Sequence, residues 1–421
     1  MTVRIVLQAP RLLAALVAGA CTGTFAQQSP QVVKPPVAQA WIDVATHGGM
    51  GMPGAMGMPG AGGGNPMSML GGLFGAGGVG QNSFGQTQAM SPGRWVDVTL
   101  YTRNNPSLAD AEQSVPSGFL SPALKLQSPK ETRGTAPEPG DERTTEPEFE
   151  RPKGRMLLYW GCGDAVRAGQ PRVVDFATAT PADFGRFFQS RRATQRGTHS
   201  ATGRPVWPSP ADTRMVPPQA SLVGEHGYTG SGVPEGFRFQ LQAAQDLMPA
   251  IALKQKDAGG ATQLEWQALP TARAYFISGM GARENNDMVI WTSSEQPDIG
   301  FGLLDYQTNA AVDRWLKEQV LLAPQTTQCT VPKGIFPGPG AMLRMIAYGN
   351  ELNLAHPPRP QDPRIAWEPD WAVKVRVKSV TSAMLGVEMP EASGTAPPAA
   401  EPGKEADKPG VKDLLKGIFG R

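Results

Sequence analysis

The sequence predicts a mainly β protein with two sandwich-like antiparallel β domains, a few short helices and long disordered segments. Many segments alternate apolar and polar residues, which is the pattern of half-buried strands. The 421-residue chain also contains 50 Gly and 41 Pro, well above their usual share of a globular chain. Much of the chain is therefore expected to be loop or disordered, and the folded part is expected to contain clearly fewer residues than the whole chain.

The first 26 residues are typical of a secretory signal peptide. Arg4 and Arg11 precede a short apolar run, and small residues lead up to Ala26. The apolar run is far shorter than the roughly 20 residues needed to span a bilayer. We expect cleavage after Ala26 and a periplasmic or secreted protein. In the alternative, Cys21 follows a lipoprotein-like Ala18-Gly19-Ala20 and is acylated.

Residues 27–103 are predicted to form a pair of strands interrupted by a low-complexity segment, 47–93. The strands carry similar phrases, WIDV at 41–44 and WVDV at 95–98. Glycine dominates the segment between them and brings no side chain to a core. Its thioethers give a candidate Cu(I) site, because soft sulfur ligands select Cu(I). The candidate ligands are Met50, Met52, Met56, Met58, Met67 and Met69. A flexible spacer whose methionines make loose contacts is the simpler interpretation.

A Pro- and Glu-rich linker is predicted over 104–153, because that stretch lacks a sustained apolar period. The first β domain is predicted over 154–260. It begins with the continuous apolar run 156–160, typical of a buried strand. Thr180-Pro181-Ala182-Asp183 has the cap, proline and acidic residue that begin a helix. Further strands are expected at 170–176, 237–241 and 250–254.

The second β domain is predicted over 261–388 and begins with an antiparallel meander. Its expected strands are 264–267, 274–277 and 288–291, and Pro270 turns the chain between the first two. Trp266 and Tyr275 are then expected to pack together as core aromatics.

The meander, about residues 262–292, resembles the B to C strand unit of fibronectin type III-like sandwiches. In that family Leu-x-Trp is followed by a short Pro-containing turn, a small residue and an inward Tyr. Leu264, Trp266, Pro270 and Tyr275 match this pattern. The resemblance implies a binding or spacer module without intrinsic catalysis, and it transfers no catalytic residue to this chain.

The rest of the second domain is predicted to contain a helix over 309–318 and strands over 326–331, 341–348 and 371–377. In the last strand, Lys374, Arg376 and Lys378 alternate with valines. We expect the valines to face the core and the cations to form a solvated, edge-protecting face. A surface for an anionic ligand is the alternative.

The chain is predicted to end in a disordered linker, 389–408, and an amphipathic helix, 409–421. The apolar residues of this helix have the spacing i, i+3, i+4, i+7, i+8; they are Val411, Leu414, Leu415, Ile418 and Phe419. So short a helix is marginal alone in water. It is expected to bind its own domain, another protein or a membrane surface, the last through 411–419.

Charge and cysteine content limit the partners and the compartment. Removal of residues 1–26 takes two arginines and no acid, so 39 basic and 37 acidic residues become 37 of each. A neutral chain argues against nucleic acid as a partner. Cys162 and Cys329 remain, and an even pair in an exported protein predicts a disulfide. Two separate buried thiols are the alternative.

No sequence motif indicates catalysis: a nucleophile elbow, a Walker loop, a dinucleotide fingerprint and an HExxH pair are all missing from the sequence. The sequence therefore favours a non-catalytic exported cell-envelope binding or scaffolding protein, with no cofactor and an envelope protein or glycan as partner. A periplasmic Cu(I)-binding protein is the first alternative. A hydrolase using Glu225 and His226 with Asp175 or Asp212 is the second.

Overall fold

The computed structural model describes residues 31–49, 82–89, 91–130, 154–283, 287–338 and 340–386. Strands are the main regular element in these residues and occur from one end of them to the other. The mainly β prediction is confirmed. The strands are β1 (Ala38–Gly49), β2 (Gly93–Thr102), β3 (Asp110–Ser114), β4 (Ala123–Gln127), β5 (Arg155–Trp160), β6 (Arg172–Asp175), β7 (Val206–Trp207), β8 (Gly224–Gly230), β9 (Arg238–Leu241), β10 (Lys254–Ala258), β11 (Ala261–Glu265), β12 (Ala274–Ala282), β13 (Met288–Thr292), β14 (Gln328–Val331), β15 (Met342–Tyr348), β16 (Leu352–His356) and β17 (Trp371–Met384). Helical elements in these residues are α2 (Pro181–Phe187), α3 (Asn309–Lys317) and the 3-10 turns η1 (Ala243–Gln245) and η3 (Phe301–Leu303).

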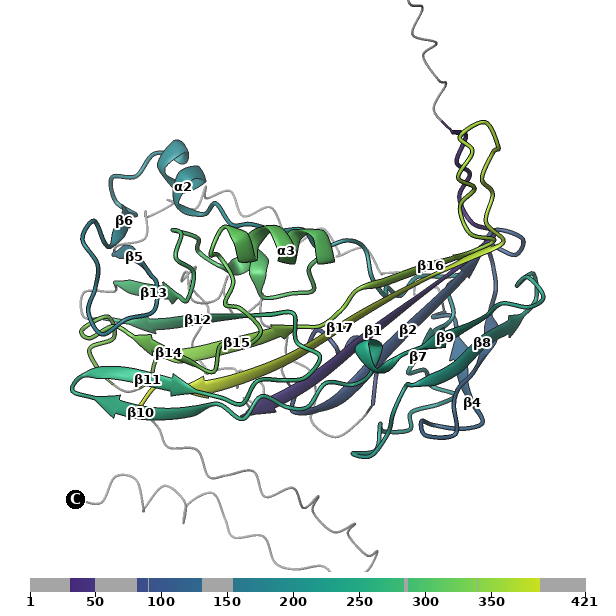
Figure 1. Ribbon diagram of the computed structural model, residues 1–421, viewed down its shortest axis with the longest axis horizontal. Helices are drawn as coiled ribbons and strands as arrows, with labels where there is room; N and C mark the ends of the chain where they lie inside the picture. Colours follow the sequence, from purple (N-terminus) through teal and green to yellow (C-terminus); the bar gives the residue numbers. More distant parts are fainter. Residues whose placement is uncertain are drawn as a thin grey trace, which may run out of the picture.

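Fourteen strands form one large sheet in the order β6-β5-β13-β12-β15-β17-β1-β2-β7-β4-β3-β8-β9, with β16 paired to β17. Figure 1 shows β17, β1 and β2 as the long strands through its middle. The two predicted strands at 41–44 and 95–98 do pair, and Asp43 lies opposite Asp97. β1 runs parallel to β17, and β13 runs parallel to β5. Chain segments far apart in sequence therefore meet at the centre of the sheet.

The sheet does not follow the predicted domain boundaries. β5, from the first predicted domain, pairs with β13 from the second, and β6 pairs with β5. The boundary at residue 260 therefore does not separate two sheets. Residues 104–130, predicted as linker, instead contain β3 and β4, each with two buried residues on alternating positions. Strands this short leave too few apolar positions to stand out from the surrounding Ser and Pro.

The predicted meander is confirmed for its second and third strands, because β12 and β13 pair antiparallel. Its first strand, β11, lies instead in a separate three-stranded sheet between β10 and β14. The connection through Pro270 carries the chain from the small sheet to the large one. The contact between Trp266 and Tyr275 is confirmed, with ring centroids 5.6 Å apart.

The two faces of the large sheet pack against different layers. Tyr275 and Ile277 of β12 face the apolar core that includes Leu264 of the small sheet. Phe276, between them, faces the opposite way and packs with Trp315 of α3. Figure 1 shows α3 on one side of the sheet and β10 and β11 on the other. Successive side chains of β12 thus alternate between the small sheet on one face and α3 on the other.

The disulfide between Cys162 and Cys329 is confirmed, with the two Cα atoms 5.3 Å apart. It joins the end of β5 to β14 and so ties the small sheet to the large one. Such a bond is consistent with an oxidising, exported location.

Local predictions about helix starts are largely confirmed. Thr180 caps α2 in a capping box with Asp183. The helix predicted over 309–318 also forms as α3, and Thr308 is its N-cap. The strand predicted at 250–254 begins instead at Lys254.

Several predicted features lie outside the described residues, and the structure tests none of them. They are the signal peptide with Ala26 and Cys21, the methionines Met50, Met52, Met56, Met58, Met67 and Met69, the linker residues 131–153, and the tail segments 389–408 and 409–421.

Candidate binding site on the charged face of the sheet

The cations of β17 are buried, so the prediction of a solvated cationic face is wrong. Lys374, Arg376 and Lys378 are only 9%, 5% and 1% exposed. The loop residues around Gln195 cover two of them: Lys374 donates to the side chain of Gln195, and Arg376 donates to its carbonyl at 2.8 Å. The loop that covers these cations is polar and has no apolar periodicity. The alternating sequence of β17 alone therefore does not reveal that its cations are buried.

Arg376 forms a bidentate ion pair with Asp43 on the neighbouring strand β1. Its Nε and Nη2 each donate to a carboxylate oxygen at 2.6 Å. Thr198 donates to the same carboxylate from its backbone N–H and its hydroxyl, at 3.1 and 2.7 Å. Burial acts to lower the pKa of Arg376, but the hydrogen bonds to Asp43 outweigh it and raise this pKa. The pair is thus fully satisfied although both side chains are buried.

Lys378 has its own partners one step along β17. Its Nζ lies 3.2 Å from Asp305 and 3.3 Å from the side-chain oxygen of Gln88. It also lies 4.2 Å from the ring centroid of Tyr306, within cation–π range. Burial lowers the pKa of Lys378, and Asp305 partly opposes that shift.

Asp97 of β2 sits under the last part of the Gly/Met-rich segment. It accepts hydrogen bonds from Gly85 N at 2.9 Å, Thr87 N at 3.1 Å and Thr87 Oγ1 at 2.5 Å. Burial raises the pKa of Asp97 to about 7, although the bonds from Thr87 and Gly85 favour the ionised form. Residues 82–89, predicted to be part of a low-complexity excursion, therefore fold over the sheet.

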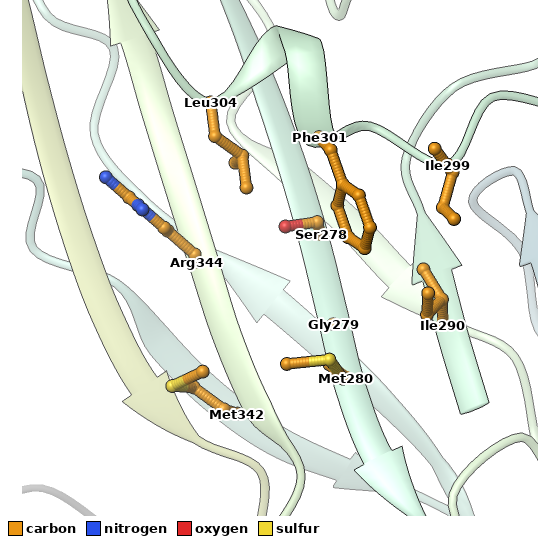
Figure 2. Close-up of a pocket in the computed structure, with 9 residues that line it drawn as sticks. All are labelled: Ser278, Gly279, Met280, Ile290, Ile299, Phe301, Leu304, Met342 and Arg344. Atoms are coloured by element: carbon orange, nitrogen blue, oxygen red, sulfur yellow. The ribbon is translucent and has the colours of Figure 1, made fainter. Parts of the chain in front are cut away.

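A small apolar hollow lies over β12, β13 and β15, under the chain around η3 (Figure 2). Its lining consists of Ser278, Gly279, Met280, Ile290, Ile299, Phe301, Leu304, Met342 and Arg344. Ser278 is the cross-strand partner of Arg344, and Met280 is that of Met342. Figure 2 shows the guanidinium of Arg344 directed away from the apolar side chains, with its aliphatic stem beside them.

A second small hollow also has Arg344 in its wall. The other lining residues are His47, Gly48, Ala89, Val380 and Ser382. His47 is buried, and neither ring nitrogen has a hydrogen-bond partner of normal geometry. Burial, and then the charges of Lys378 and Arg344, lower the pKa of His47 to about 3, against a smaller opposing effect of nearby backbone carbonyls. The imidazole is therefore neutral at pH 7.

The structure does not gather the residues of the hydrolase alternative. His226 is fully buried and contacts Gln113 and the Leu222 carbonyl, at 3.1 and 2.8 Å. Asp212 pairs with Arg214 at 2.6 Å, and Glu225 pairs with Arg238 at 3.3 Å. Asp175 lies on the edge strand β6, whereas His226 lies on β8, near the opposite edge of the sheet. Asp175 accepts a hydrogen bond from Ala177 N at 2.9 Å. Each of these residues thus has a partner that explains it structurally.

A projecting arm is formed by residues 31–37 and 357–370. Lys34 N donates to Trp367 O at 2.9 Å, and Trp367 N donates to Val32 O at 2.8 Å, which joins the two segments. In Figure 1 the arm rises beyond the ends of β1, β16 and β17 as a yellow-green loop beside a purple segment. Three apolar residues of the arm are largely exposed: Val32 at 61%, Val33 at 51% and Ile365 at 54%.

Comparison with known proteins gives no relative: no family model matches the chain, and no curated protein or solved structure is similar to it. The fibronectin type III-like resemblance of residues 262–292 therefore stays a prediction. Within the described ranges, no helix has the length and apolar character to cross a membrane. In the same ranges, no group of three His, Cys, Asp or Glu side chains is arranged to hold a metal ion.

Sequence reasoning missed Arg344 as a site residue, although a signal was present. The segment AMLRMIAY places a single arginine in an otherwise apolar strand, and a charge in such a strand must meet a polar environment. Asp43 and Asp97 gave a second signal of buried charge, because each is the acidic residue in one of the two similar strand sequences, WIDV and WVDV.

Proposed function

We propose that the chain is a non-catalytic, exported binding or scaffolding protein of the cell envelope that docks to an envelope protein through its arm. The observation that carries this proposal is the exposure of Val32, Val33 and Ile365 on an element that projects from the sheet. A disulfide and a signal-like N-terminus support export to the periplasm or beyond.

The chemistry of the arm favours a protein partner. Its apolar residues lie among charged ones: Lys34 pairs with Glu368 at 2.8 Å, and Arg364 pairs with Asp362 at 2.7 Å. An apolar centre inside a polar rim is the usual anatomy of a protein interface. Full burial of one Val or Ile side chain is worth about 1.5–3 kcal/mol. Three such side chains, already half exposed, are enough to anchor a modest interface.

The rigidity of the arm favours docking over random contact. Gln31 donates to the carbonyl of Ile365 at 2.9 Å and accepts from Arg359 at 2.6 Å. Arg359 also lies 5.7 Å from the ring centroid of Trp367. These contacts hold the two segments together before any partner binds, which lowers the entropic cost of association.

The test is recovery of partners from detergent-solubilised native envelope with three purified proteins. The test variant is Val33→Ser/Ile365→Ser, and the matched control is Val173→Ser/Met215→Ser, whose residues are also exposed but lie away from the arm. We expect one protein to be recovered by the wild type and the control and lost with the arm variant. Equal recovery by all three proteins would contradict docking through the arm.

A further inference from the structure

We propose that protonation of the buried His226 releases the hairpin of β8 and β9 from the base of the arm, so that the arm is held in place at neutral pH and loosened in acid. The consequence for binding rests on the docking function proposed above. The release itself is a property of the fold and needs no partner.

His226 joins three parts of the chain at one buried imidazole ring. Its Nε2 lies 2.8 Å from the carbonyl oxygen of Leu222, just before β8, and carries the proton of the neutral ring because a carbonyl oxygen only accepts. Its Nδ1 then accepts from the side-chain amide of Gln113 on β3, at 3.1 Å. Phe239 of β9 stacks on the ring, with the two centroids 5.5 Å apart. The ring therefore ties the hairpin to β3.

A second proton on this ring has no favourable position. It goes on Nδ1, which faces the amide N–H of Gln113, so that two donors meet. If the amide turns over, the hydrogen bond is restored but the imidazolium still lacks a counterion, and an unpaired buried charge is costly. Burial accordingly lowers the pKa of His226, against a smaller opposing effect of the Leu222 carbonyl.

The ionisable side chains of β8, β9 and β3 give the imidazole no counterion. On the hairpin, Glu225 pairs with Arg238 at 3.3 Å, and both side chains are exposed. On β3, Asp110 and Glu112 occupy the exposed positions of a strand whose alternate positions are buried. Burial raises the pKa of Tyr228 on β8 well above its usual value, so its hydroxyl is neutral.

The carboxylate beside the segment before β8 is also engaged. Asp246 accepts from the hydroxyl of Ser221 at 2.7 Å and from Leu222 N at 2.8 Å. Within the described ranges, no carboxylate contacts the imidazole of His226. A proton taken up here is therefore accommodated by opening the hairpin to water.

The hairpin packs on the base of the arm through an aromatic stack. Phe237, directly before β9, stacks on Trp371, with the ring centroids 4.9 Å apart and the planes at 9°. Both side chains are buried. Trp371 begins β17 and directly follows the arm segment 357–370. Figure 1 shows β8 and β9 at the same end of the molecule as the arm, and β9 is the edge strand of the sheet. Detachment of the hairpin thus removes packing from the residue that anchors the arm.

The test is hydrogen exchange of the full mature chain, with the disulfide intact, at pH 7.5 and 5.5. Because the folded pKa of His226 lies below the ordinary value of about 6.5, attachment of the hairpin is strongest above that pH and weakens as the pH falls below it. We expect the protection factors of Tyr228 N in the hairpin, and of Lys34 N and Trp367 N in the arm, to be as much as about tenfold lower at pH 5.5. Amides of β12 and β15, in the middle of the sheet, should keep theirs.

Variants then assign the response to His226. His226→Gln keeps a donor and an acceptor but takes up no proton, so protection in the hairpin and the arm should no longer fall in acid. Gln113→Glu supplies the missing counterion and should also suppress the fall. His356→Gln is the control, because His356 is the other histidine that stacks on Trp371, at 5.4 Å, and it should respond like the wild type. If neither test variant folds, the wild-type comparison of hairpin, arm and central strands still decides the question.

Four results would overturn the proposal. They are unchanged protection of the hairpin at pH 5.5, loss in the hairpin without loss in the arm, equal loss in β12 and β15, and the wild-type response in folded His226→Gln. A failure of docking is recognised separately, by recovery from the envelope at pH 7.5, and leaves the exchange results unaffected.

Discussion

The buried pair of Asp43 and Arg376 allows a sharp test of the charged face. Their side chains are 1% and 6% exposed, and two hydrogen bonds of 2.6 Å join them. Removing one partner of such a pair leaves an uncompensated buried charge, which costs about 3–5 kcal/mol. We therefore expect Asp43→Asn and Arg376→Met each to lower the free energy of unfolding by about that amount at pH 7.

The double variant Asp43→Leu/Arg376→Met tests whether the single variants lose stability because they leave one buried charge without its partner. Replacing a whole buried pair by apolar side chains of similar volume is often neutral or stabilising. The double variant is thus expected to be more stable than either single variant. Arg376→Lys keeps the charge but loses the bidentate geometry, so it should cost about 2 kcal/mol.

Urea denaturation followed by tryptophan fluorescence, with the disulfide intact, measures all four variants. An exposed ion pair contributes only about 0–1 kcal/mol. Single variants that each lose less than about 1 kcal/mol would mean that the cations of β17 face solvent, as the strand pattern alone predicted, and would refute the buried arrangement.

Two further predictions concern the same fold. Because burial raises the pKa of Asp97 from 3.8 to about 7, its contribution to stability is fully present below pH 4 and lost as pH rises towards 7; this is roughly 4 kcal/mol in total. The unfolding free energies of the wild type and of Asp97→Asn are measured as a function of pH, and the stability advantage of the wild type should fall over that range. If the two curves stay parallel, Asp97 is ionised in the folded protein throughout. The disulfide spans a sequence separation of 167 residues, so Cys162→Ala/Cys329→Ala should lose roughly 2–5 kcal/mol in urea denaturation. A loss below about 1 kcal/mol would mean that the two sheets stay together without it.

Local features of the fold were predictable, because they depend on neighbours in sequence. The capping box of Thr180 and Asp183 and the strands carrying Asp43 and Asp97 depend on short-range chemistry and alternation. The disulfide was predictable because the expected removal of residues 1–26 leaves an even pair of cysteines, Cys162 and Cys329. In each case a few adjacent residues, or a count of one residue type, carried the information.

Strand order was not predictable, since pairing depends on long-range contacts. β1 pairs in parallel with β17, more than 300 residues away, and no local pattern selects that partner over others. β11 has the alternation expected for the large sheet but joins the small one. Alternation along β17 correctly placed Lys374 and Arg376 on one face of the sheet. The polar loop around Gln195 covers them, and nothing in the sequence of that loop indicates where it packs.

Site-specific photo-crosslinking in the native envelope tests the binding function most directly. A photoreactive residue is placed at Ile365 on the arm and, as the matched control, at Val173 on the edge strand β6, which is 47% exposed. We predict one discrete adduct with an envelope protein from position 365 and none of the same mass from position 173. No adduct from position 365, or identical adducts from both positions, would contradict docking through the arm.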